Sequence, residues 1–200
     1  MNKIASIRKD WGLIETLIEE NRNILDIGCG DGMLMEQLQK NLNAKTHGIE
    51  LDRELASKAI AKGFNVIHGD AEIDLAQYSN QSFDYVILSQ TLQAMIEPKK
   101  ILTELLRVGS KAIVSFPNFG HWLCRAQILF KGTMPVTNDL KLAWYDTQNI
   151  HLCTIRDFNN LILELNLQIN EKFGINKKKV LSFPFNLFSL NIFASHAVFV

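Results

Sequence analysis

Apolar and polar positions between Asn23 and Pro117 follow two alternating periods. Four short runs, NILDIG, KTHGIE, NVIHGD and FDYVILS, have the apolar and β-branched character of strands buried in a sheet. The segments between them repeat apolar residues every three or four positions, which predicts helices near 31–41, near 53–62 and, weakly, after residue 72. Strands and helices that alternate in this order predict a parallel sheet covered by helices on both faces.

The same alternation continues toward the C-terminus. Pro98 stands at the first position of a predicted helix that ends at Gly109, and the strand KAIVSFP follows it. Further along, TIRDFNNLILELNL predicts a helix capped by Thr154 and Asp157, and LQINEKFGI and HAVFV predict two terminal strands. With a further helix at 11–20, the chain is expected to form a doubly wound, mostly parallel α/β sheet of seven strands.

Residues 118–152 interrupt this alternation. The segment is rich in aromatic residues and turn formers, and periodicity resumes only after it. Segments of this length inside a compact domain usually form a lid or a binding surface. No repeat, low-complexity tract or flexible linker divides the chain, so we expect one domain over residues 1–200 with an inserted lid or partner segment at 118–152.

Composition narrows the classes of partner. Lys plus Arg and Asp plus Glu are equal at 21 each, so the chain has no broad positive field to attract nucleic acid or an anionic membrane. The apolar C-terminal segment VLSFPFNLFSLNIFASHAVFV contains a proline, two asparagines and a histidine, which argue against a membrane-spanning helix. Three scattered cysteines and a charged N-terminal segment favour a reducing cytoplasm.

The segment NILDIGCGDG, which begins at Asn23, joins the first strand to a helix through three glycines in five residues. In open α/β sheets the ligand lies beyond the carboxyl ends of the strands, where glycines let it approach backbone N–H groups at a helix N-terminus. The dinucleotide-binding fingerprint requires a third glycine where this chain has Met33. The spacing therefore locates a ligand site without indicating a dinucleotide.

The charges around this loop favour a ligand without phosphate. Asp26 and Asp31 lie beside and within it, and residues 23–39 contain no lysine or arginine. At about 5 Å and an effective dielectric constant near 20, each carboxylate repels each unit charge of a pyrophosphate by roughly 3 kcal/mol. An amino-acid end suits the loop better, because its ammonium group is attracted to Asp26 while its carboxylate meets backbone N–H groups. S-adenosylmethionine (SAM) has such an end and no phosphate.

Carboxylates also end the next two predicted strands. Glu50 has two oxygens that can accept hydrogen bonds from both hydroxyls of a ribose, a feature that NAD-dependent enzymes share. Asp70 can accept from an adenine amino group, and the N–H of Ala71 can reach a ring nitrogen. The structural alternative is that the glycines only turn the chain and that the carboxylates, Asp31 among them, cap helices.

The sequence LDIGCGDG resembles the first motif of the class I SAM-dependent methyltransferases, which have a Rossmann-like fold. The resemblance implies that SAM, or its product S-adenosylhomocysteine, occupies the site, with Leu51, Ala71 and Ser89 beside the adenosine. The residues expected to line the pocket are Asp26, Gly28, Cys29, Gly30, Glu50, Leu51, Asp70, Ala71 and Ser89. We interpret Cys29 as a small side chain tolerated in a tight turn rather than as a reactive thiol.

Segments outside the glycine loop carry a narrower resemblance. LSQTLQA, VSFPNFGHW, MPVT and WYDTQNIHLCTIRDF resemble motifs of the MetW family of methionine biosynthesis proteins, although Gln148 replaces a proline of that family. The resemblance implies a role in making methionine in partnership with the homoserine O-acyltransferase MetX, as support or regulation of homoserine acylation. It leaves open whether the chain transfers methyl groups.

Methyl transfer requires alignment of the acceptor, and a base only where the acceptor loses a proton. The inserted segment supplies His121, Tyr145, Asp146 and His151 as weak catalytic candidates. The alternative is that the aromatic residues of the segment belong to the core or to a partner surface and that the histidines make ordinary hydrogen bonds. The chain lacks the Asp/Asn-Pro-Pro-aromatic motif of nucleobase methyltransferases. The spacing of its histidines and cysteines does not predict a metal site.

Three functions remain. The first is a SAM-binding protein that acts with the acyltransferase, and the second is a methyltransferase that acts on an unidentified small molecule. An NAD-dependent oxidoreductase is kept only because Glu50 suits the ribose of either cofactor.

Overall fold

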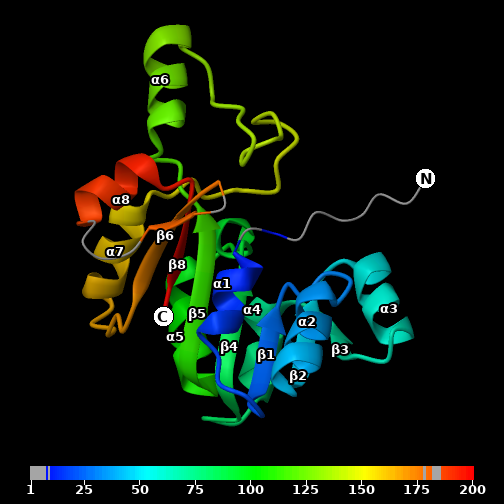
Figure 1. Cartoon of the computed structure of the whole chain (residues 1–200). Coiled ribbons are helices and arrows are strands. Elements are labelled where there is room, and N and C mark those ends of the chain that lie inside the picture. The colour runs from blue at the N-terminus through cyan, green and yellow to red at the C-terminus, as the bar shows by residue number, and fades with distance from the viewer. Residues whose placement is uncertain (1–7, 9, 178, 182–185) are drawn as a thin grey trace.

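The computed structural model describes residue 8 and residues 10–177, 179–181 and 186–200. Strands and helices alternate as far as residue 117 (Figure 1). The elements of this part are α1 (Trp11–Thr16), β1 (Asn23–Ile27), α2 (Met33–Leu42), β2 (Lys45–Glu50), α3 (Arg53–Ala61), β3 (Asn65–His68), α4 (Ala71–Asp74), β4 (Phe83–Ser89), α5 (Pro98–Val108) and β5 (Gly109–Pro117). The remaining elements are α6 (Trp122–Lys131), α7 (Ile155–Glu164), β6 (Lys172–Asn176), β7 (Lys179–Leu181), α8 (Leu187–Phe193) and β8 (His196–Phe199).

Within the described residues, eight strands form one mixed sheet in the order β3-β2-β1-β4-β5-β8-β6-β7. β1 to β5 pair in parallel, whereas β8 pairs antiparallel with β5 and β6, and β6 with β7. The predicted doubly wound α/β fold is confirmed, and the two predicted terminal strands, β6 and β8, lie next to each other in the sheet. The prediction of seven strands is wrong by one, because β7 is a three-residue edge strand too short to show an alternating pattern.

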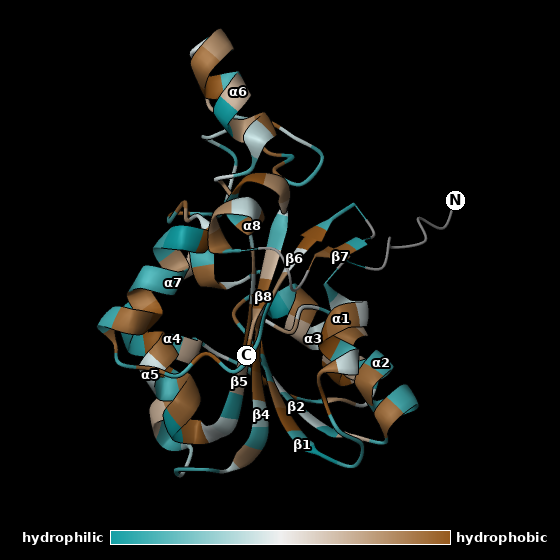
Figure 2. Ribbon diagram, turned by 60° about the vertical axis from the view of Figure 1, so that its left-hand side comes forward, coloured by the Kyte–Doolittle hydropathy of each residue, from teal (hydrophilic) through white to brown (hydrophobic). Residues whose placement is uncertain are grey.

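Successive residues of the central strands are buried on opposite faces of the sheet. On one face, Leu25 and Ile27 of β1 belong to a core that α4, α5, α7 and α8 complete. On the other face, Ile24 packs with residues of α1 and α2, and a smaller cluster joins α3 to Val66 of β3. Figure 2 shows the two helical layers on either side of the sheet.

Local signals account for the starts of two helices. Pro98 is the first residue of α5, as predicted. α7 begins with the predicted capping box, in which the Thr154 hydroxyl accepts from the N–H of Asp157 and the Asp157 carboxylate accepts from the N–H of Thr154, each at 3.2 Å. The predicted helix at 11–20 is shorter in the structure, where α1 ends at Thr16.

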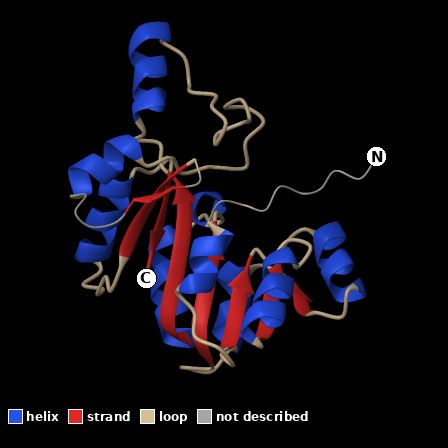
Figure 3. Ribbon diagram, in the orientation of Figure 1, coloured by secondary structure: helices blue, strands red, loops and turns tan. Residues whose placement is uncertain are grey.

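Residues 118–152 leave the sheet after β5. They form α6, a helix that was not predicted, and then a loop that contains no helix or strand from residue 132 to residue 154 (Figure 3). α6 projects from the end of the molecule at which β5 finishes (Figure 1). In the part of the chain that the structure describes, no helix has both the length and the apolar content needed to cross a bilayer.

Candidate functional site

The predicted pocket residues lie at the carboxyl ends of four neighbouring strands. β1 lies between β2 and β4 in the sheet, so successive crossovers leave β1 in opposite directions. Open α/β sheets bind ligands at this reversal. Asp26 lies in β1 and the glycine loop follows it, Glu50 and Leu51 end β2, Asp70 and Ala71 follow β3, and Ser89 ends β4.

Gly28 and Gly30 have positive φ angles of 71° and 59°, a region that glycine adopts without strain. Their surroundings differ. A Cβ atom on Gly28 would lie 2.7 Å from Oγ1 of Thr91, so this glycine permits close packing of the loop after β4. A Cβ atom on Gly30 would meet no atom within 4 Å. Gly30 therefore borders open space, as a residue beneath a ligand does.

Glu50 holds the glycine loop in shape. Its Oε2 accepts a hydrogen bond from the N–H of Gly30 at 2.7 Å, and its Oε1 accepts from the N–H of Asp52 at 2.8 Å. A carboxylate has about four acceptor positions, so each oxygen keeps capacity for one hydroxyl of a ribose. Glu50 can therefore order the loop and bind a ribose at the same time.

Asp26 is the most unusual group at this edge. Its side chain is 2% exposed and makes no hydrogen bond with the described residues. Burial raises the pKa of Asp26 to about 7; the charges of Glu50 and Asp10 act in the same direction, and Arg8 opposes them. Buried carboxylates are normally paired or hydrogen-bonded, so Asp26 is a partly satisfied anion that a ligand cation would stabilise.

The amides of the loop are largely used within the protein. The N–H groups of Gly28 and Cys29 donate to the carbonyl of Ile49, so a ligand carboxylate needs a further donor. Arg8 places a hydrogen-bond donor at this edge of the sheet. Its Nη2 donates to the carbonyl and the hydroxyl of Ser89, at 2.8 and 2.9 Å, and its Nε is buried without a hydrogen bond to any described residue.

Asp10 anchors this arginine. Oδ2 of Asp10 accepts from the hydroxyls of Ser89 and Ser115, at 2.8 and 2.5 Å, and from Nη2 of Arg8 at 3.3 Å. Burial raises the pKa of Asp10, but the charge of Arg8 and the two hydroxyl donors outweigh burial and hold the pKa below its ordinary value. The hydrophobic pattern did not single out Arg8 or Asp10, and the only signal in the sequence is a pair of charges before α1.

Leu51, Asp70 and Ala71 lie at the neighbouring strand ends. Oδ1 of Asp70 accepts from the N–H of Glu72 at 2.9 Å and so caps α4, as the structural alternative proposed, which leaves Oδ2 for a ligand. Leu51 is 68% exposed, and a ligand ring would cover it. Ala71 is buried, so its backbone N–H is the group that could contact a ligand.

The capping role considered for Asp31 is not found. Its carboxylate forms an ion pair with Nζ of Lys62 at 2.9 Å, and Gly32 occupies the N-cap position of α2 without a side-chain hydrogen bond. Lys62 comes from the end of α3 and lies outside residues 23–39, which contain no lysine or arginine. Asp31 is thus paired with a lysine, whereas Asp26 forms no hydrogen bond or ion pair with the described residues.

Cys29 has the environment of a structural side chain. A Cβ atom on Gly48 would come within 2.6 Å of its sulfur, so the thiol fills the space above this glycine of β2. Burial, reinforced by the charges of Asp26 and Glu50, raises the pKa of the thiol well above its ordinary range. Reactive cysteines have lowered pKa values, so these observations agree with a packing role.

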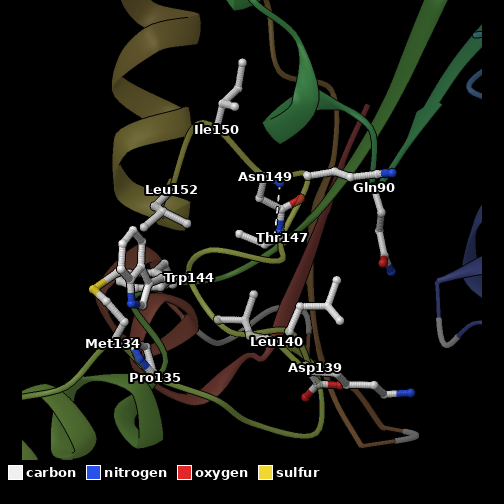
Figure 4. Close-up of a pocket in the computed structure, with 14 residues that line it drawn as sticks. Gln90, Met134, Pro135, Asp139, Leu140, Trp144, Thr147, Asn149, Ile150 and Leu152 are labelled. Carbon is white, nitrogen blue, oxygen red and sulfur yellow. Dashed lines mark hydrogen bonds between the residues drawn. The ribbon is translucent and has the colours of Figure 1, made fainter.

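A cavity of about 730 Å³ lies between the end of β4 and the loop of residues 132–154 (Figure 4). Met134, Leu140 and Trp144 contribute to its apolar wall, and Gln90 borders it from the end of β4. This volume suits a small molecule. Nε2 of Gln90 donates to Oδ1 of Asp10 at 3.3 Å, which connects the wall of the cavity to the residue that anchors the arginine.

The four weak catalytic candidates do not gather around this cavity. His121 is buried at the N-cap of α6 and borders a smaller cavity, and His151 borders another. Tyr145 and Asp146 are exposed on the loop, where the ring of Tyr145 meets that of Trp144 edge to face. Across the described ranges, no three His, Cys, Asp or Glu side chains come together as metal ligands would.

The α/β fold and its mainly parallel sheet are those of the class I SAM-dependent methyltransferases. The plantazolicin methyltransferase BamL, solved with S-adenosylhomocysteine and a substrate analogue, is 16% identical with a TM-score of 0.68. The alignment covers 97% of this chain and 86% of that one. A SAM-dependent methyltransferase of Thermotoga maritima is 18% identical with a TM-score of 0.66, over 96% and 86% of the chains.

The chain belongs to the family described as methionine biosynthesis protein MetW, whose sequence model matches residues 8–200. A relative in Rhodopirellula baltica, the bifunctional methionine biosynthesis protein MetXA/MetW, is 32% identical over 176 residues. That alignment covers 84% of this chain and 28% of the longer protein, so the chain spans less than a third of this relative. The resemblance to MetW that the sequence motifs indicated is confirmed.

Proposed function

We propose that the pocket at the glycine loop binds SAM. The observation that carries this proposal is Asp26, a buried carboxylate with no hydrogen-bond partner among the described residues. Gly30, in the loop that follows β1, faces open space. The ammonium group of SAM would supply the missing positive charge. Its carboxylate would lie toward Arg8, whose buried Nε is a free donor within the described residues.

The other end of the ligand fits the neighbouring strand ends. The two oxygens of Glu50 would accept from the ribose hydroxyls, while Oδ2 of Asp70 and the N–H of Ala71 would meet the adenine. Leu51 would then lose its exposure beneath the adenine ring. SAM supplies an activated methyl group when it is bound, and the residues named here bind and orient it without taking part in proton transfer.

We further propose that the chain acts with a MetX-like homoserine O-acyltransferase, as support or regulation of homoserine acylation. The family assignment and the fused MetXA/MetW relative support this partnership. SAM is made from methionine, so its occupancy of the pocket would report on how much methionine the pathway has produced.

The partnership is tested by measuring homoserine acylation by the purified acyltransferase of the same organism while this chain is added. We expect the two proteins to co-purify and the rate to change to a plateau at a stoichiometric amount of the chain. An unchanged rate together with no binding would overturn the partnership.

A genuine methyltransferase is the second candidate, and the cavity of about 730 Å³ beside the end of β4 favours it. An acceptor in this cavity would lie next to the strand ends that hold the proposed cofactor. Formation of S-adenosylhomocysteine with a defined small acceptor, abolished by Asp26→Asn, would establish this activity. No formation in a broad acceptor screen, with a chain shown to bind SAM, would count against it.

A further inference from the structure

α6 is an arm that buries few of its residues against the rest of the protein. Of its ten residues, Trp122–Lys131, Cys124 is the one that is buried. Figure 1 shows the helix standing away from the body of the molecule. A ten-residue helix gains most of its stability from packing of an apolar face, so a helix in this position calls for another explanation.

The arm is held at its base and along one side by hydrogen bonds. Nε of Arg125 donates to the carbonyl of Gly120 at 2.6 Å. The amide side chain of Gln127 exchanges two hydrogen bonds with the backbone of Val136, at 3.0 and 3.1 Å, and Gly132 ends the helix in the left-handed conformation. These contacts define the direction of the helix and leave its outer face uncovered.

That outer face is apolar. Trp122, Leu123, Leu129 and Phe130 fall within a stripe about 120° wide on a helical projection, on the side opposite Cys124. Their exposed fractions are 48%, 40%, 76% and 82%. Figure 2 shows hydrophobic residues along this projecting helix. We call these four residues the arm stripe.

The size of the arm stripe indicates an interface. Together the four side chains expose on the order of 500 Å², near the upper end of the largest apolar patch on typical monomers. A standard protein–protein interface buries about 800 Å² on each partner, so the stripe would supply more than half of one side. A single helix with an apolar face suits docking into a groove.

The charges on α6 distinguish between a second copy of the arm and a groove on another protein as the occupant of the stripe. α6 contains two basic residues, Arg125 and Lys131, and no acidic residue. If two copies of the arm paired antiparallel through the stripe, the flanking Arg125 side chains would face each other, and such like-charge contacts oppose association. An apolar groove with an acidic rim would instead complement both the stripe and Arg125, which lies at its edge.

We propose that the arm stripe docks into an apolar, acid-rimmed groove of the homoserine O-acyltransferase. This inference rests on the proposed function, because it names the surface through which that partnership acts. The fused relative is consistent with it, since both units there belong to one polypeptide. The arm and the glycine loop use different residues, so contact with the partner leaves the ligand pocket intact.

The test measures the affinity of the full-length chain for the purified acyltransferase by biolayer interferometry. The double variant Leu129→Gln, Phe130→Gln should bind at least thirtyfold more weakly than the wild type, and Phe130→Gln alone at least fivefold. The matched control is Leu163→Gln on α7, where the leucine is 61% exposed and lies outside the arm. Calorimetric affinity for SAM and circular dichroism should be the same for all of these proteins.

The outcomes separate the two proposals. If the wild type binds the acyltransferase and the double variant binds equally well, the arm assignment is overturned while the partnership stands. If the wild type does not bind, the partnership itself fails and the arm assignment fails with it. If light scattering shows a wild-type dimer that the double variant loses, without a change in partner affinity, the occupant is a second copy and the proposal is overturned.

Discussion

At the scale of single residues, the buried carboxyl group of Asp26 has a stability cost that the proposed ligand would offset. The pKa of its carboxyl lies at about 7 in the folded chain and near 3.8 in the unfolded one. Between these values the folded state binds more protons, so the contribution of Asp26 to stability is greatest below about pH 4 and is lost as pH rises through 7. Without a ligand cation, the ionised form weakens the fold at neutral pH.

Asp26→Asn should therefore stabilise the chain in the absence of ligand. We expect its free energy of unfolding at pH 8 to exceed that of the wild type by on the order of 2 kcal/mol, and the difference to shrink toward pH 5. Urea unfolding at the two pH values measures it. Asp31→Asn is the control, because that carboxylate is partly exposed and paired with Lys62, and we expect less than about 1 kcal/mol of change. A variant less stable than the wild type at pH 8 would contradict this interpretation.

The same carboxyl predicts how SAM affinity depends on pH. Below pH 7 a proton on Asp26 competes with the ligand ammonium group, so affinity should rise by up to tenfold per pH unit toward neutrality. Above roughly pH 8 the ligand amino group loses its own proton, and affinity should fall again. Calorimetry from pH 5.5 to 8.5 tests this, and a flat profile below pH 7 would remove Asp26 from the ammonium site.

Arg8 and Asp10 illustrate why part of the site could not be predicted. Their partners Ser89 and Ser115 lie 79 to 105 positions away in the sequence, and no local pattern records such contacts. Asp26, Glu50 and the glycines became candidates because they lie at or just after the ends of strands that the hydrophobic pattern reveals. The hydrogen bond from the N–H of Gly30 to the Glu50 carboxylate could not be predicted from the sequence.

At the scale of elements, the strength of the local signal separates the predicted helices from α6, which was not predicted. β1, β4, β5 and α5 have apolar runs or stripes that face a core, and α7 has a capping box as well. The stripe of α6 faces outward, and a histidine occupies its N-cap. Its aromatic residues therefore indicated a lid or partner surface but not a helix.

The capping box of α7 gives a test at this scale. Thr154→Ala removes the hydroxyl that accepts from the N–H of Asp157, and we expect a loss of about 1 kcal/mol in the free energy of unfolding. Thr103→Ala in the middle of α5 is the control, since alanine has the higher helix propensity there and stability should stay the same or rise slightly. Equal losses in both variants would show that the box adds nothing.

At the scale of the whole molecule, the proposed SAM pocket and the inserted segment are connected through side chains. Arg8 bonds to Asp10, Asp10 accepts from Gln90, and Gln90 borders the cavity whose other wall is the loop after α6. A ligand that engages Arg8 acts on the first member of this series. The connection supplies a physical route by which occupancy of the pocket could alter the surface offered to a partner.

Thermodynamic linkage makes the regulatory form of the proposal measurable. If SAM changes the affinity of the chain for the acyltransferase by a given factor, the acyltransferase must change the affinity for SAM by the same factor. We expect a factor of at least five in both directions, and a smaller factor in the variant Gln90→Leu. Equal SAM affinity for the free and the partner-bound chain would exclude regulation through this pocket.

Calorimetric titration of the chain with SAM and with NAD tests the central claim most directly, namely that the pocket at the glycine loop is built for SAM. We predict saturable one-to-one binding of SAM, loss of that binding in Asp26→Asn, and no binding of NAD under the same conditions. Binding of NAD but not SAM, or SAM binding unchanged by Asp26→Asn, would contradict the claim.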